Sequence, residues 1–125
     1  MTDYSKANYD ELEAVEMGPV QGVFSRSALE CEQIGVSRFT FAPDFDGSIG
    51  HRHSVQEEVY VVVSGSGRMR MDDEIIDVRP WDVIRVAPTV IRGFRSGSDG
   101  LVIVVAGGTR PPDGDGEMFK DWWTD

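Results

Sequence analysis

Two histidines and a glutamate lie close together in this 125-residue chain, and they are residue types that hold metal ions. His51 and His53 are its only histidines, and Glu58 follows shortly after them. Side chains two residues apart on an extended chain project to the same face, so both imidazoles can approach one ion or ligand. Imidazole plus carboxylate is a ligand set for a divalent first-row transition metal, namely Fe, Mn, Ni or Zn.

The residues after Glu58 predict a strand that holds its carboxylate on rigid structure. The run Val59 to Val63 is β-branched throughout apart from one tyrosine. Gln56 and Tyr60 have the same strand parity as Glu58, so both are candidate ligand-binding residues. For Tyr60, simple core packing is the open alternative.

The spacing of these residues resembles the first motif of the cupin superfamily. That motif is His-x-His, three or four residues, Glu, six residues and Gly, and it is matched by His51, His53, Glu58 and Gly65. Six residues separate Glu58 from Gly65, whereas Glu57 would need seven, so the register selects Glu58. The resemblance implies a small single-domain cupin with His51, His53 and Glu58 as metal ligands. The usual glycine before the first histidine is replaced by Phe45.

The second cupin motif, Gly-x5-Pro-x-Gly-x2-His-x3-Asn, is expected between Trp81 and Ser96. Every named residue of that motif differs here, and Arg92 stands where the histidine would be. Two interpretations stay open. Arg92 either binds a substrate carboxylate or turns away, leaving a two-His-one-carboxylate metal site, or it neutralises Glu58 in a site without metal.

Two function hypotheses follow from the resemblance and from Arg92. The first is a small-molecule-binding cupin that is a metal-dependent enzyme, dioxygenase-like or isomerase-like, with Arg92 orienting a small acidic substrate. The alternative is a metal-free ligand-binding or sensing module in which Arg92 replaces the metal-ligand histidine of the second motif.

Short β-rich runs separated by Gly, Pro, Asp and Ser predict an all-β fold. The cupin likeness sharpens this to a jelly-roll barrel, or double-stranded β-helix, over residues 20–108. Residues 1–19 are expected to form an irregular N-terminal arm and residues 109–125 an irregular C-terminal tail. The predicted strands are Val20 to Arg26, Ala28 to Gln33, Val36 to Ala42, Val59 to Val63, Arg68 to Met71, Glu74 to Asp77, Asp82 to Val86, Ile91 to Arg95 and Leu101 to Ala106.

The amino-acid composition indicates which binding partners and which cellular compartment to expect. The 22 acidic and 12 basic residues give a net charge of -10, which disfavours nucleic acid and anionic membrane surfaces as partners. The single cysteine cannot form an internal disulfide, and no signal peptide or transmembrane stretch is visible. We expect a soluble cytoplasmic protein.

Two predicted strands, Val59 to Val63 and Leu101 to Ala106, are apolar on both faces and therefore need a cover on the outside. We expect a homodimer formed sheet to sheet, as is common in cupins, with the N-terminal arm or the Trp122-Trp123 tail as the alternative cover. A hairpin turning at Asp72-Asp73 is expected to pair Met69 with Ile76 and Arg68 with Asp77. Solvated positions are expected for Arg68, Arg70, Arg79, Arg85 and Arg95.

Overall fold

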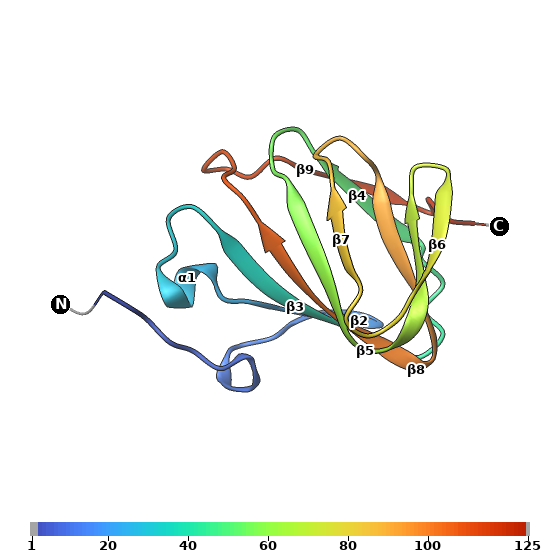
Figure 1. Cartoon of the computed structure of the whole chain (residues 1–125), viewed down its shortest axis with the longest axis horizontal. Coiled ribbons are helices and arrows are strands. Elements are labelled where there is room, and N and C mark those ends of the chain that lie inside the picture. Colours follow the sequence, from blue (N-terminus) through green and yellow to red (C-terminus); the bar gives the residue numbers. More distant parts are fainter. Residues whose placement is uncertain (1–2, 125) are drawn as a thin grey trace.

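Two long antiparallel strands, β5 (Glu58–Met71) and β8 (Arg92–Gly107), lie side by side and organise the molecule (Figure 1). The computed structural model describes residues 3–124, so residues 1, 2 and 125 of the expected arm and tail lie outside the described part. The other elements are η1 (Tyr9–Glu11), β1 (Val15–Met17), β2 (Val20–Phe24), α1 (Arg26–Leu29), β3 (Gly35–Phe41), β4 (Ile49–His53), β6 (Glu74–Val78), β7 (Val83–Val86) and β9 (Gly116–Lys120).

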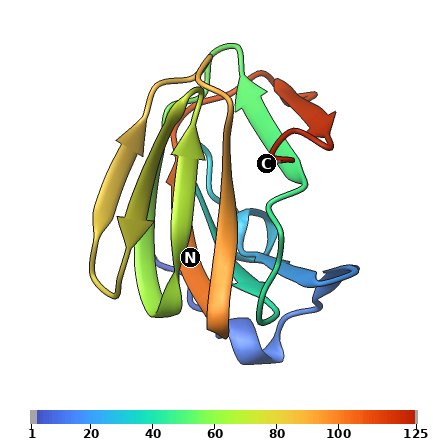
Figure 2. The ribbon, with the colours of Figure 1, turned by 90° about the vertical axis from the view of Figure 1, so that its right-hand side faces the viewer.

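All strand pairs are antiparallel, and the sheet curls on itself until its two halves face each other (Figure 2). One half follows the order β1-β2-β3-β8-β4-β9, while β5 pairs with β6, β7 and β8. Because β5 and β8 run through both halves, each of the two strands contributes residues to both walls of the barrel. The predicted all-β jelly roll is confirmed.

Gly65 is required where β5 bends across β8. Its φ is +86°, and a Cβ at this position would collide with the carbonyl oxygen of Gly100. The pairing register shifts on both sides of the glycine, between Val62 and Ser64 and between Gly65 and Gly67. Such irregularities bend a strand and increase its twist. The motif glycine is therefore the point at which β5 turns from one half of the sheet into the other.

The core fills the space between the two halves with aromatic and branched side chains. Four aromatic rings pack in a chain with centroids 5.4 to 5.7 Å apart, in the order Tyr60, Phe94, Phe41 and Phe45. Val62, Leu101 and Ile103 are fully buried beside them. Inward and outward positions alternate along β5, so Tyr60 and Val62 point inward while Val61 and Val63 point outward.

The strand predicted for Ala28 to Gln33 is wrong. Arg26–Leu29 forms the short helix α1 instead, and Glu30 ends it in the left-handed conformation with φ 57°. Ala28 and Leu29 favour helix, and the Glu30 N–H donates to the carbonyl oxygens of Arg26 and Ser27, which closes the turn. The chain re-enters the sheet only at Gly35.

The two ends of the chain are more regular than the sequence indicates. In the expected arm, β1 pairs with β2, and Asp10 and Tyr9 contact Arg38 of β3 through an ion pair of 2.8 Å and a ring contact of 5.5 Å. In the expected irregular tail, β9 pairs with β4. This correction matters for the site, because β4 carries both histidines.

The tail tryptophans are held by two arginines that we expected in solvent. The Arg70 guanidinium stacks 4.5 Å from the Trp122 ring, and that of Arg95 stacks 4.2 Å from the Trp123 ring. Each arginine also donates to the backbone carbonyl of its tryptophan, at 3.2 and 3.1 Å. These cation–π contacts tie residues 122–123 to the barrel.

The β5–β6 hairpin has the predicted register. Arg68 lies opposite Asp77 and Met69 lies opposite Ile76, and both members of the charged pair are exposed. Asp72 begins the turn with φ 51°, a conformation that Asp tolerates better than most residues. Within residues 3–124, no helix has the length and hydropathy needed to cross a lipid bilayer.

Candidate functional site

Both histidines and Glu58 meet at one end of the barrel interior. His51 and His53 project from the same face of β4, with ring centroids 5.1 Å apart, and Glu58 is the first residue of β5. One potential ligand atom from each of the three residues lies within 4.8 Å of the others. The structure therefore brings together the three residues that the sequence proposes as a metal site.

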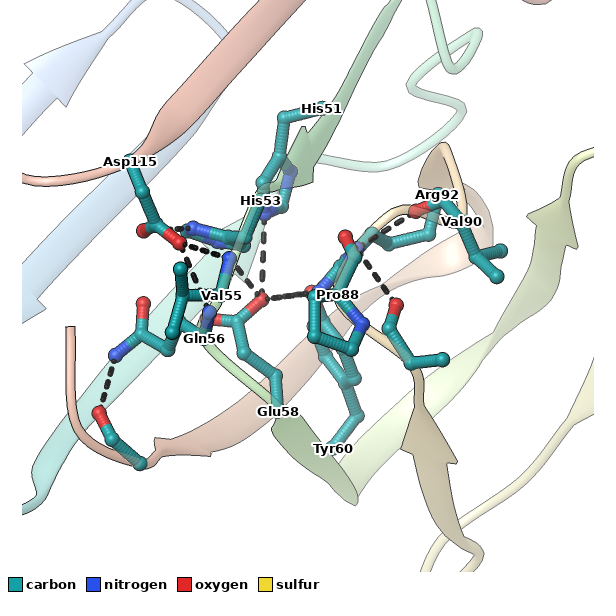
Figure 3. A network of polar contacts seen from close by, with 12 residues as sticks. His51, His53, Val55, Gln56, Glu58, Tyr60, Pro88, Val90, Arg92 and Asp115 are labelled. Atoms are coloured by element: carbon teal, nitrogen blue, oxygen red, sulfur yellow. Dashed lines mark hydrogen bonds and ion pairs between the residues drawn. The ribbon is translucent and has the colours of Figure 1, made fainter.

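The Oε1 atom of Glu58 is the centre of this cluster (Figure 3). It accepts hydrogen bonds from the Tyr60 hydroxyl at 2.8 Å and from Nη2 of Arg92 at 3.0 Å. The Nε2 atoms of His51 and His53 lie 3.4 and 3.3 Å from the same oxygen. Burial alone would raise the pKa of Glu58, but the hydrogen bonds from His51, His53 and Tyr60 hold that pKa well below its ordinary value.

Arg92 lies directly opposite His51, at the start of β8, and its side chain is 0% exposed. Its Nη1 donates to the carbonyl oxygens of Val90 at 2.6 Å and Pro88 at 3.0 Å, and its Nε donates to the Tyr60 hydroxyl at 3.0 Å. All three guanidinium nitrogens are thus bound by protein groups. In this geometry Arg92 is the buried counter-ion of Glu58, and its role toward a substrate stays a prediction.

Tyr60 joins Glu58 to Arg92 and also lines the barrel cavity. Burial, together with the negative charge of Glu58, raises the pKa of the Tyr60 phenol. The hydroxyl therefore stays protonated and remains the donor to Glu58.

Asp115, which sequence analysis did not single out, completes the cluster from the loop before β9. Its Oδ1 lies 2.8 Å from Nδ1 of His53, and its Oδ2 accepts from the backbone N–H groups of Val55 at 2.7 Å and Gln56 at 2.8 Å. Burial would raise the pKa of Asp115, but these two N–H groups and His53 lower it to about 2. Glu58 raises the pKa of His53, burial lowers it, and Asp115 raises it further, so that the pKa lies above its ordinary value.

Gln56 lies beside the site without entering the cavity. Its side-chain amide donates to the Gly108 carbonyl at 2.9 Å, and it is not among the residues that line the cavity. The cavity has a volume of about 310 Å³ and has His51, Glu58, Tyr60 and Arg92 in its wall. A larger, open hollow of about 780 Å³ near Asp46 and Arg95 contains none of these four residues.

The residues fit a metal ion only in part. In favour, Asp115 lies 2.8 Å from Nδ1 of His53 and so orients the imidazole with Nε2 toward Glu58, as a carboxylate does for many metal-ligating histidines. Against, Glu58 Oε1 already accepts from Tyr60 and from a buried cation. The group can offer three ligand atoms, but its carboxylate already forms an ion pair with the buried Arg92 guanidinium, whose charge opposes that of a metal ion.

Comparison with known proteins assigns the fold. The cupin domain family matches residues 37–107, more than half of the chain. No curated protein shows significant sequence similarity to the chain. Among solved structures, a cupin protein from Bacteroides fragilis is 24% identical over 90% of this chain and 89% of its own, with a TM-score of 0.72.

The chain is also similar in structure to two proteins that have individual names, Pac13 and KdgF. A variant of Streptomyces Pac13 solved with uridine is 18% identical over 97% of this chain and 93% of its own, with a TM-score of 0.78. Pac13 is described as a nucleoside dehydratase. KdgF from a Halomonas species is 19% identical over 85% of this chain and 96% of its own, with a TM-score of 0.69.

The jelly-roll topology, the histidine pair on β4 and the matched family define a small cupin. This chain belongs to the cupin domain family.

Proposed function

We propose that this cupin binds a small molecule in its barrel without a metal ion, and that Arg92 takes over the charge-balancing role that a metal would have beside Glu58. The observation that carries the proposal is the contact of 3.0 Å between Nη2 of the fully buried Arg92 and Oε1 of Glu58. His51 is the partly exposed member of the cluster and faces the bound molecule.

Electrostatics supports the metal-free arrangement. At an effective dielectric constant of about 20, two unit charges about 4 Å apart interact by about 4 kcal/mol, so Arg92 would repel a divalent ion at that distance by roughly 8 kcal/mol, which offsets the similar attraction that Glu58 would provide. Arg92 cannot relieve this repulsion by losing its proton, because a guanidinium does not deprotonate in proteins. It cannot easily move away either, since Val90 and Pro88 hold it through their carbonyl oxygens.

A metal-dependent enzyme is the second candidate, favoured by one specific observation. The bond of 2.8 Å between Asp115 and Nδ1 of His53 is the arrangement that orients metal-ligating histidines in general. In this alternative, His51, His53 and Glu58 hold a first-row divalent ion and Arg92 leaves the cluster. Such an ion would act as a Lewis acid toward the substrate.

Metal titration distinguishes the two candidates. We expect calorimetric titration of Mn, Fe(II), Ni and Zn to give the same weak heats for the wild type and for His51→Ala, because in both proteins the buried Arg92 guanidinium repels an ion beside Glu58. Arg92→His should bind one ion per chain, since it removes the guanidinium and adds a third imidazole. One ion bound per wild-type chain and lost in His51→Ala would reject the metal-free proposal in favour of the enzyme.

We also propose that the protein is a homodimer that buries the outer face of β5 and β8. Val59, Val61 and Val63 are outward residues of β5, and Val83 of β7 is exposed directly beside Val61. The N-terminal arm contacts β3 through Arg38, which leaves the β5–β7 side for a partner. A second copy would remove this apolar surface from water.

Sedimentation equilibrium at micromolar concentration tests the dimer. We expect twice the monomer mass for the wild type and a shift toward monomer for Val83→Glu, because a charge would be buried at the interface. Val15→Glu alters another exposed valine, on β1, and should leave the mass unchanged. A wild-type monomer at these concentrations would count decisively against the dimer.

A further inference from the structure

The barrel cavity is apolar almost everywhere except at the Glu58 cluster. Of the sixteen residues that line its 310 Å³, twelve are apolar or glycine, and the four others are His51, Glu58, Tyr60 and Arg92. Three of these four belong to a network that is already hydrogen bonded internally. A ligand in this cavity therefore meets one polar end and an otherwise apolar wall.

The mouth of the cavity is apolar as well. Met17, Phe24, Ile49 and Met118 all line the cavity, and they are 41%, 50%, 41% and 64% exposed. Large apolar side chains in such exposed positions, gathered at one opening, mark a place where apolar ligands enter. The two methionines are flexible and fit ring-shaped molecules of varied outline.

The polar end offers one particular acceptor. All four contacts of the Glu58 carboxylate go to Oε1, namely those from Tyr60, Arg92, His51 and His53. Among the described residues no contact to Oε2 is found, and Oε2 is not one of the buried polar atoms without a partner. Since Glu58 lines the cavity and Oε1 already has these four partners, Oε2 is the carboxylate oxygen left to accept a hydrogen bond from a ligand.

Charge limits what that ligand can be. Arg92 already balances Glu58, and all three of its nitrogens are bound, so no free cation remains in the cluster to receive an anion. An added anion would face Glu58 across an apolar cavity, and an added cation would be buried without a free counter-charge. Both cost free energy that a neutral molecule does not incur.

We propose that the cavity takes a neutral, mainly apolar ring compound that carries one hydroxyl group, and that this hydroxyl donates to Oε2 of Glu58. The inference rests on the proposed small-molecule binding and specifies its ligand class. It separates this protein from Pac13, whose solved ligand is the polar nucleoside uridine. The ring packs among the apolar wall residues.

Four probes of different polarity test the ligand class: phenol, toluene, benzoate and uridine. The signals of 13C-labelled methionine methyl groups report the place of binding, because Met17 and Met118 line the cavity whereas Met69 and Met71 do not. Methionine-to-leucine variants assign the signals. We expect phenol to shift the Met17 and Met118 signals most, and to bind roughly tenfold more tightly than toluene, which cannot donate to Glu58.

Benzoate and uridine should leave the Met17 and Met118 signals unchanged when each is added at the concentration at which phenol saturates its shift of those signals. If either shifts those signals at lower concentration than phenol, the neutral-hydroxyl class is overturned while small-molecule binding in the barrel stands. Equal affinity for phenol and toluene would overturn the role of Oε2. If no probe shifts the two signals, the ligand class is rejected, and the metal titration judges the proposed function independently.

Discussion

Replacing Arg92 by leucine is expected to lower the free energy of unfolding by about 3 to 5 kcal/mol, because the change leaves the Glu58 carboxylate without its buried counter-ion. The side chain of Glu58 is only 12% exposed, so water compensates little of the loss. The carbonyl oxygens of Val90 and Pro88 lose their donors at the same time. Urea denaturation at neutral pH, with wild type and variant at one protein concentration, measures the difference.

A second arginine–glutamate pair provides a matched control. Arg85 and Glu57 form an ion pair of 2.6 Å between β7 and the segment before β5, but their side chains are 64% and 55% exposed. Arg85→Leu should therefore cost under about 1 kcal/mol. The double variant Arg92→Leu/Glu58→Leu should be less destabilised than Arg92→Leu alone, because it leaves no unpaired charge. If Arg92→Leu costs no more than Arg85→Leu, Arg92 is not the counter-ion that we infer.

The residues of the cluster differ in how far the sequence could predict them. His51, His53 and Glu58 follow from a local spacing on strands, and residue 92 follows from the register of the second motif. The sequence left two interpretations of Arg92 open, because the position of its guanidinium is fixed by the backbone carbonyls of Val90 and Pro88, which no side-chain pattern encodes.

Asp115 and β9 escaped prediction for a different physical reason. Residues 116–120 read Gly-Glu-Met-Phe-Lys, which has no β-branched residue and little alternation, so their strand depends on pairing with β4 rather than on local preference. That pairing places Gly116 opposite His53 and thereby brings Asp115 to the imidazole. The fold class was predictable because turns and β-rich runs are local, whereas this contact spans 62 residues.

Asp115→Ala is expected to lower the free energy of unfolding by about 2 to 3 kcal/mol, because one carboxylate holds three donors. The N–H groups of Val55 and Gln56 lose their acceptor, and Nδ1 of His53 loses its partner. The side chain of Asp115 is 2% exposed in spite of its place in a loop, so these bonds are shielded from water. Asp113→Ala, which removes an exposed acid of the same loop, should be nearly neutral.

The pKa shifts of Asp115, Glu58 and His53 predict how the stability of the protein changes with pH. The pKa of Asp115 falls from an ordinary 3.8 to about 2 on folding, so its stabilisation is present above about pH 4 and is lost as the pH falls toward 2. The lowered pKa of Glu58 acts in the same direction. The raised pKa of His53 has the opposite sign, since its contribution is complete below about pH 6.5 and is lost as the pH rises through the folded-state value. Stability should therefore be greatest between these two limits.

Asp115→Asn separates the charge of this carboxylate from its shape. The amide oxygen can still accept from one backbone N–H, but the variant has no charge to lose in acid, so the decline in stability between about pH 4 and pH 2 should be shallower than in the wild type. The pKa of His53, followed by NMR through its ring protons, should fall because a group that raises it has been removed. An unchanged acid limb together with an unchanged His53 titration would show that Asp115 is not coupled to the site.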